Sequence, residues 1–301
     1  MSTDAARDNG TVTSPGVYPW MPDAVYHADP VPGGSLSASG AKTLLKAPAK
    51  FAYERQHGRP DKREFDIGHA AHLLALGAGP HLHVTERETW NTNAVKEEVA
   101  VARLAGKVPI KPSEFEVVSD MAYALRQHPI ASELLDPTTM RPEVSVFWYD
   151  PWAPTVMRRA RLDAISQPDA DGGQIVVDYK TTTAADEDSI SKAMWNYGYA
   201  LQAAWYLDAA TNLPDRPLVI ADRFLFIFQE KTPPYLVTVV EPNPDALRVG
   251  EKQAREAVDL YAACVESGRW PGYVPDNEIP LIGLPGWVER QHATDDYEEI
   301  L

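Results

Sequence analysis

Two acidic residues and a lysine stand close together in a segment that is predicted to form a β-hairpin. Asp178 and Lys180 are two residues apart in the apolar run 174–181, and Asp163 lies in the apolar run 156–165. Residues two apart in a strand share a face, so Asp178 and Lys180 are expected to point to the same side. If the two strands pair through the polar turn at 169–173, both carboxylates and the lysine can meet on one patch.

This combination of groups suits the hydrolysis of phosphate esters. Carboxylate oxygens are hard ligands of the kind that Mg2+ prefers, and a bound Mg2+ polarises a phosphoryl oxygen and readies a water for attack. A lysine beside it can orient or deprotonate that water, or stabilise charge that grows on the phosphate. The plain alternative is a hairpin with a surface ion pair, because three residues in D-x-K spacing recur easily by chance.

The rest of the chain alternates between predicted helices and strands that would position these groups. Strands are predicted at 143–149, 155–165, 174–181, 223–229 and 236–240, and the longer helices at 65–76, 93–105, 112–127 and 243–267. A further helix after Ser37 or Ser39 belongs to a helical N-terminal part, and another follows residue 186. This order predicts an α/β fold, with a mixed central β-sheet of about five strands flanked by helices.

Composition bounds the domain organisation and the kinds of site. We expect a flexible N-terminal segment at 1–25, a single domain at 26–270 with its catalytic core at about 140–240, and an irregular acidic tail at 271–301. The one cysteine, Cys264, rules out an internal disulfide and a four-cysteine iron–sulfur cluster. The sequence has no apolar run long enough to span a bilayer, and its first residues lack the apolar region of a signal peptide. We therefore expect a cytoplasmic location and no membrane partner.

The net charge of −15 argues against indiscriminate coating of DNA, although a local basic track can still contact phosphates. Basic residues gather in the segments 42–63 and 158–161. The candidates for DNA contact in these segments are Lys42, Lys46, Lys50, Arg159 and Arg161. The alternative for such a cluster is a solvated helix face.

Two histidines lie on the mostly apolar helix predicted at 65–76. His69 and His72 are three residues apart and share a face, and Gly68, four residues before His72, allows a neighbouring backbone to approach closely. For a lone histidine on such a helix, a satisfied core residue is the plain expectation. Spacing alone therefore does not make either histidine a ligand.

Several segments, taken in order over roughly residues 35–210, form a more specific pattern than any one of them. They are L-S-A-S-G-A-K-T-L-L-K-A-P-A-K-F, F-D-I-G-H-A-A-H-L-L-A-L, E-V-S-V-F-W, R-A-R-L-D, V-D-Y-K-T-T and Y-A-L-Q-A-A-W-Y. The ordered set resembles the PD-(D/E)xK nuclease superfamily, and within it the phage exonucleases of the exonuclease VIII (RecE-like) type. This resemblance covers the helical N-terminal part and the whole predicted hairpin.

The resemblance implies a set of site residues. The implied metal ligands are His72, Asp163, Asp178 and the backbone carbonyl of Tyr179, and the implied catalytic residues are Lys180, Glu143 and Gln202. His69 stands where the family pattern usually has a small hydroxyl residue, and we choose His72 as the ligand. The plain alternatives are an exposed strand-edge residue for Glu143 and a tolerated polar residue on a packed helix for Gln202.

The resemblance also implies an activity and its partners. We expect an exodeoxyribonuclease that uses one or two Mg2+ ions, with Mn2+ as a substitute, and that digests linear double-stranded DNA ends from 5′ to 3′. The 3′ single-stranded tails would serve phage-type homologous recombination with a single-strand annealing protein. A ring-shaped homo-oligomer, encoded by a phage or prophage and located in the bacterial cytoplasm, is implied as well. Two alternatives stay open: a non-catalytic DNA-binding accessory protein on the nuclease fold, and a restriction-type endonuclease.

Overall fold

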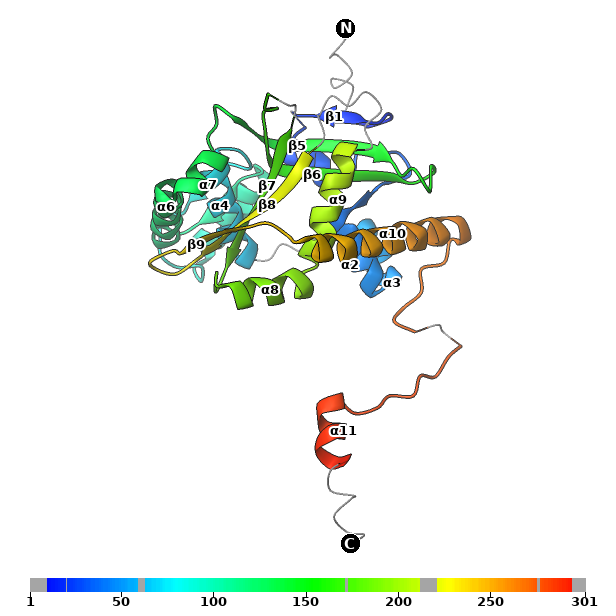
Figure 1. The fold of residues 1–301 in the computed structure, drawn as a ribbon. Helices are drawn as coiled ribbons and strands as arrows, with labels where there is room; N and C mark the ends of the chain where they lie inside the picture. The colour runs from blue at the N-terminus through cyan, green and yellow to red at the C-terminus, as the bar shows by residue number, and fades with distance from the viewer. Residues whose placement is uncertain are drawn as a thin grey trace.

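A mixed β-sheet covered by helices on both faces forms the centre of the molecule (Figure 1). The structure is a computed structural model, and it describes residues 10–19, 21–58, 63–170, 173–211, 221–274 and 277–293. The α/β fold with a mixed central sheet, predicted from the order of periodic segments, is confirmed. In the described part of the chain, no helix is long and apolar enough to cross a membrane.

The sheet contains seven strands in the described ranges, where about five were expected. Its strands are β1 (Gly16–Tyr18), β2 (Leu36–Ser37), β5 (Met140–Tyr149), β6 (Met157–Ser166), β7 (Gln174–Thr182), β8 (Ala221–Glu230) and β9 (Val237–Val240). They follow the order β1-β5-β6-β7-β8-β9, and β2 pairs with β6. The pairs β7–β8 and β2–β6 are parallel, and the other neighbours in this sheet are antiparallel.

The helices form a layer on each side of this sheet (Figure 1). They are α1 (Asp23–His27), α2 (Ala38–Lys46), α3 (Pro48–His57), α4 (Arg63–Leu76), α5 (Asn93–Leu104), α6 (Pro112–Gln127), α7 (Pro129–Leu134), α8 (Glu187–Asn196), α9 (Tyr199–Thr211) and α10 (Pro244–Ser267). A further helix, α11 (Gly286–Ala293), lies apart from these layers. Helices α2, α9 and α10 bury one apolar core against the sheet, and α4 and α6 bury another on the opposite face. A separate parallel pair, β3 (Leu82–Val84) with β4 (Val108–Ile110), adjoins α4.

Local sequence signals account for several helix boundaries. Ser37, rather than Ser39, caps α2, and its hydroxyl accepts a hydrogen bond from the backbone N–H of Gly40 at 3.1 Å. Asn243 caps α10 in the same way, and Gly268 ends that helix at φ +65°, where glycine carries no steric cost. These caps lie at the boundaries that the sequence pattern predicted for the two helices.

Helices α9 and α10 cross with their backbones in contact. A Cβ atom added to Gly250 of α10 would lie 2.1 Å from the carbonyl oxygen of Ala200 on α9. Only a residue without a side chain fits this crossing. The close approach seats α9 against the sheet, and α9 carries Gln202.

Both ends of the chain differ from expectation within the described residues. The N-terminal segment expected to be flexible contains β1, which pairs with β5, and Val12 is 1% exposed. Residues 1–9 and Trp20 lie outside the description. The segment after residue 270, expected to be irregular, contains helix α11, which Figure 1 shows apart from the main body. Strand β1 has three residues, too few for its alternation to stand out in the sequence.

Candidate active site

Three carboxylates occupy one row across three neighbouring strands. The antiparallel register of β5 and β6 sets Glu143 opposite Asp163. Strands β6 and β7 pair at Ala164 and Val177, and Asp163 and Asp178 are the next residues of the two strands beyond this pair, close enough to affect each other's pKa. Like charges that face each other across strands repel, so this row, which we call the carboxylate row, requires positive charge beside it.

Both ladders are interrupted at the carboxylate row. Glu143 has a φ of +54°, a left-handed conformation that is uncommon for a residue with a side chain. On the other side of β6, the backbone N–H of Tyr179 donates to Oδ2 of Asp163 at 3.0 Å. The carboxylate of Asp163 therefore lies in the gap where β7 diverges from β6.

Strand β2 occupies the same edge of β6 further along, so β6 has a forked edge. Leu36 and Ser37 of β2 pair with Arg158 and Arg159, whereas β7 pairs at the opposite end of β6. Helix α2 begins directly after β2. The fork therefore brings the N-terminal part of the chain, including Lys42, beside the carboxylate row.

His72 lies between two members of the row. Its Nε2 is 3.1 Å from Oδ2 of Asp163, and its Nδ1 is 3.4 Å from Oε1 of Glu143. Burial lowers the pKa of His72, but the two carboxylates outweigh burial and raise the pKa above its usual value. Burial raises the pKa of Asp163, but His72 and Lys180 outweigh burial and lower it. The structure places His72 in this cluster, whereas His69 is exposed on the same helix.

A second set of contacts surrounds Asp178, which is fully buried. Nζ of Lys180 contacts its Oδ2, and the side-chain amide of Gln202 donates to its Oδ1 at 2.6 Å. Lys42 in turn donates to Oε1 of Gln202 at 3.1 Å. These four side chains form a continuous chain from α2 through α9 to β7.

The charged groups in this second set shift one another's pKa values. Burial and the nearby Asp163 raise the pKa of Asp178 to about 6, although Lys180 opposes this rise. Burial lowers the pKa of Lys180, but Asp178 and Asp163 outweigh it and raise the pKa above the usual value. Burial and the neighbouring Lys180 lower the pKa of Lys42 to about 7. At neutral pH the ammonium group of Lys180 is therefore charged.

The residues predicted to contact DNA fall into two groups. Lys46 and Lys50 are exposed on α2 and α3. Arg159 is engaged inside the protein by Asp29, at 2.6 Å, and by the hydroxyl of Ser35. These contacts join β6 to the loop before β2. The DNA contact predicted for all these residues stays a prediction.

Arg161 is held by three groups of the protein and is about 10% exposed. Its Nε contacts Oε2 of Glu143, and its Nη1 donates to Ser145 Oγ and to the Met21 carbonyl, each at 3.0 Å. The contact with Glu143 places an arginine at one end of the carboxylate row. The sequence pattern did not indicate this pairing, because Arg161 and Glu143 lie on different strands.

Tyr199 belongs to the cluster but was not among the predicted site residues. Nζ of Lys42 lies 5.2 Å, and Nζ of Lys180 5.5 Å, from the centre of its ring. Its position three residues before Gln202 on one helix face was the signal that could have identified it. Tyr179, in contrast, donates its phenol hydroxyl to Gln229 on the other face of the sheet, at 2.6 Å. The role of its backbone carbonyl stays a prediction.

The donor atoms of the row fit a hard divalent cation in type. Glu143, Asp163 and Asp178 offer carboxylate oxygens, and His72 offers an imidazole nitrogen. Among the described residues, no three such side chains already form a preformed metal site. His72 instead contacts Asp163 and Glu143, and the ammonium group of Lys180 contacts Asp178, so side chains of the protein engage all three carboxylates.

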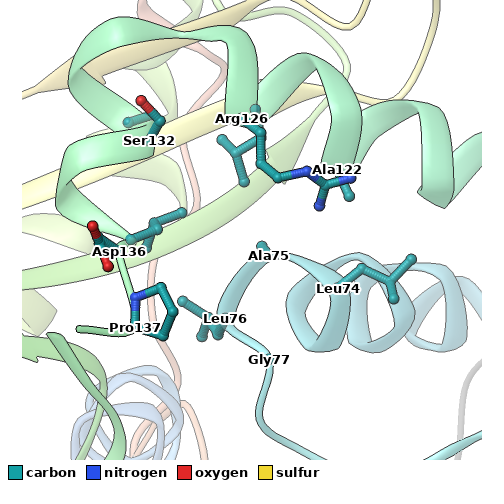
Figure 2. Close-up of a pocket in the computed structure, with 12 residues that line it drawn as sticks. Leu74, Ala75, Leu76, Gly77, Ala122, Arg126, Ser132, Asp136 and Pro137 are labelled. Atoms are coloured by element: carbon teal, nitrogen blue, oxygen red, sulfur yellow. The ribbon is translucent and has the colours of Figure 1, made fainter. Parts of the chain in front are cut away.

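A pocket of about 420 Å3 lies elsewhere in the molecule, between the end of α4 and the helices α6 and α7. Figure 2 shows its wall, in which Leu74 and Leu76 of α4 face the segment that carries Arg126, Ser132 and Asp136. None of its lining residues belongs to the carboxylate row or to the contacts around it. The candidate site is therefore the row at the fork of β6, and not this pocket.

Comparison with known families identifies the superfamily of this chain. The family model of the PD-(D/E)XK nuclease superfamily matches residues 35–272. The chain belongs to that superfamily. The match includes the carboxylate row, Lys180 and Gln202, and it confirms the family predicted from the ordered motifs. Nucleases of the PD-(D/E)XK superfamily generally use divalent metal ions.

A solved structure shares the fold of this chain. A protein described as a candidate exonuclease from Eubacterium rectale has a TM-score of 0.54 at 11% identity, over 85% of this chain and 92% of its own. At that identity the likeness shows a shared fold. No curated protein matches the sequence.

Two further structures are similar at lower scores. A phage-related exonuclease from Haemophilus somnus has a TM-score of 0.33 at 9% identity, over 78% of this chain and 96% of its own. An alkaline exonuclease from Laribacter hongkongensis has a TM-score of 0.26 at 12% identity, over 77% of this chain and 99% of its own.

Proposed function

We propose that this chain is a divalent-metal-dependent exodeoxyribonuclease that acts on the ends of linear double-stranded DNA. The observation that carries the proposal is the carboxylate row, with the ammonium group of Lys180 in contact with its last member, Asp178. Membership of the PD-(D/E)XK nuclease superfamily supports a nuclease. The preference for DNA ends and the 5′ to 3′ direction rest on the resemblance to exonucleases of the RecE-like type.

The proposed metal is Mg2+, with Mn2+ as a substitute and one or two ions in each site. Asp163, Asp178 and His72 would hold it, with the backbone carbonyl of Tyr179 as a further ligand. When bound, the ion polarises the phosphoryl oxygen and lowers the pKa of a coordinated water. Binding would replace the contacts that His72 now makes with Asp163 and Glu143.

The side chains around the row have separate roles in this proposal. Lys180 acts as a cation that stabilises negative charge growing on the phosphate, because its raised pKa keeps it protonated at neutral pH. Gln202 donates to Asp178 without adding charge, and so fixes the orientation of that carboxylate. Arg161 holds one carboxylate oxygen of Glu143, Oε2, and the other oxygen orients the attacking water.

The proposed biological setting also follows the resemblance. The product would be duplex DNA with 3′ single-stranded tails for phage-type homologous recombination, passed to a single-strand annealing protein. A homo-oligomeric ring around DNA, in the cytoplasm of a bacterial host, completes the proposal. Sedimentation of the purified chain tests the oligomer, and co-purification with an annealing protein from the same phage or prophage tests the partner.

One comparison separates the proposed activity from its alternatives. Linear duplex and closed circular duplex are incubated with the protein, with Mg2+ or with a chelator. Loss of the linear form alone, only with Mg2+, supports the exonuclease. Cutting of both forms supports a restriction-type endonuclease, and loss of neither supports a DNA-binding accessory protein. End-labelled linear duplex then gives the direction of digestion.

Variants test whether the carboxylate row is responsible. Lys180→Ala and Asp163→Ala are expected to abolish digestion of linear duplex while circular dichroism shows folded protein. Lys107→Ala, at an exposed position away from the row, is the matched control and should digest as the unaltered chain does. If Lys180→Ala and Asp163→Ala both digested linear duplex at the rate of the unaltered chain, the proposed site would be rejected.

A further inference from the structure

Aromatic side chains lead from the candidate site to the surface at the corner between α8 and α9. We call Trp195, Tyr197 and Tyr199 the aromatic corner. The ring of Tyr199 lies 5.5 Å from Nζ of Lys180, and the ring of Tyr197 lies 5.6 Å from that of Tyr199, at 36° to it. Tyr197 is 64% exposed and Trp195 is 70% exposed. The corner therefore begins beside the row and ends in solvent.

The inner ring of the aromatic corner, that of Tyr199, is packed against the sheet. Tyr199 packs against Phe226 and Phe228 of β8, with ring centres 5.5 and 5.8 Å away. Its pKa is raised by burial, in keeping with its place at the edge of the apolar core. The outer ring of Tyr197 consequently has a rigid neighbour on its inner side and solvent on its outer side.

The turn at Gly198 sets the angle of the corner. Gly198 has a φ of +61°, which directs the chain from the end of α8 into α9. The Cβ atom that it lacks would lie 3.3 Å from the aliphatic chain of Lys42. Lys42 can therefore run along the turn to reach Gln202 and the ring of Tyr199. The two lysines therefore meet at the ring of Tyr199, at the inner end of the corner.

We infer that the aromatic corner is a stacking platform for unpaired nucleobases of the DNA strand whose phosphate lies at the carboxylate row. Aromatic rings bind successive bases by stacking whatever the sequence, and neighbouring cations attract the phosphates between them. Here the cations are Lys180 and Lys42, and the outermost rings are Tyr197 and Trp195. The inference rests on the proposed nuclease function, and it adds that the last nucleotides are separated from their partners before cleavage.

The test measures binding in Ca2+, which accepts looser geometry than Mg2+ and is expected to permit binding without cleavage. Fluorescence anisotropy follows a forked duplex with a short unpaired end, and a second duplex in which the unpaired bases are replaced by abasic sites. The protein variants are Tyr197→Ala, Tyr197→Phe, and the double variant Trp195→Ala with Tyr197→Ala.

Loss of the bases should weaken binding to the unaltered chain about 10-fold or more, which is the scale of one stacked base. Tyr197→Ala should lose much of this preference for the forked duplex, and the double variant, which lacks both exposed rings, should bind the forked and abasic duplexes about equally. The double variant should bind no better than Tyr197→Ala. Tyr197→Phe retains the ring and should bind and discriminate as the unaltered chain does.

Three results would overturn the inference. The double variant could still favour the forked duplex over the abasic one as strongly as the unaltered chain does. Tyr197→Phe could lose as much affinity as Tyr197→Ala, which would indicate a contact through the hydroxyl. Lastly, Tyr197→Ala could change the oligomeric state in sedimentation without changing DNA affinity, which would make the corner a protein interface.

Failure of this inference is distinguishable from failure of the proposed function. If the unaltered chain neither binds nor digests DNA, the proposed function itself is wrong. If it digests linear duplex and the double variant digests forked and blunt duplexes at the same rates as the unaltered chain, only the stacking platform is wrong.

Discussion

The carboxylate of Asp163 accepts a hydrogen bond from the backbone N–H of Tyr179 across a gap where their strands no longer pair. The side chain of Asp163 therefore accepts a hydrogen bond from a backbone N–H of β7 and contacts His72 with the same oxygen, Oδ2. A variant at position 163 therefore changes two things, the charge that faces His72 and the acceptor for the N–H of Tyr179, and the choice of replacement can separate them.

Asp163→Ala and Asp163→Asn are expected to be equally inactive but to differ in stability. Asparagine retains an oxygen that can accept from the N–H of Tyr179, whereas alanine leaves that donor without its partner, at a cost of roughly 1–3 kcal/mol. Urea unfolding of both variants in chelator measures the difference. Equal free energies of unfolding would contradict the structural role of the carboxylate.

His72 should make metal-free stability depend on pH. Its folded-state pKa is raised by the carboxylates, so its ion pairs stabilise the fold fully below the unfolded pKa of 6.5 and lose that effect as pH rises through the folded value. The stability advantage of the unaltered chain over His72→Gln should thus be greater at about pH 6 than at about pH 9. Urea unfolding in chelator checks this.

The same protonation should oppose metal binding, because only neutral imidazole ligates a metal. Mn2+ affinity, measured by calorimetry, should therefore rise with pH in the unaltered chain. The rise should be smaller in His72→Gln but not absent, since Asp178, with a pKa raised to about 6, titrates in both proteins. An identical pH dependence in the two proteins would contradict a ligand role for His72.

Lys42 and Gln202 should act on the reaction as one unit. Lys42 donates to the amide oxygen of Gln202, which leaves the amide nitrogen to donate to Asp178. Lys42→Met and Gln202→Leu are each expected to lower the rate of digestion. The double variant should lose less than the product of the two single effects, with a coupling of roughly 0.5–3 kcal/mol. If the double variant lost the full product of the two single effects on the rate, Lys42 would act independently of Gln202.

Replacement of an exposed lysine and replacement of an enclosed arginine should affect the protein differently. Lys46→Gln and Lys50→Gln are each expected to weaken binding in Ca2+ and to reduce the dependence of log affinity on log salt by about 1. Arg159→Gln should instead lower stability, because it breaks contacts with Asp29 and Ser35. A reduced salt dependence for Arg159→Gln, with unchanged stability, would reverse this assignment.

Much of the β core could be predicted from the sequence because its signals are local. Alternation and a polar turn indicated the hairpin of β6 and β7, whose antiparallel pairing the structure shows at Ala164 with Val177 and at Ile165 with Val176. The turn residues Asp171 and Gly172 themselves lie outside the description. The motif order, in turn, was sufficient to predict the PD-(D/E)XK superfamily.

The remaining features depend on contacts between distant segments. Strand β2 has two residues, and its pairing with β6 follows from packing and not from any periodicity. The inward position of Lys42 depends on how α2 docks against α9, which no local pattern encodes. Likewise, Arg159 is held by Asp29 and Ser35, which lie more than 120 residues away in the chain.

Gly250 lies on the outer helix α10, yet it determines how deeply α9 settles toward the sheet. Helix α9 carries both the amide that steadies Asp178 and the ring that faces two ammonium groups. A methyl group at position 250 would force α10 and α9 apart, so α9 could not keep its present position and both groups would shift relative to Asp178. A residue outside the candidate site thus determines where two of its side chains lie.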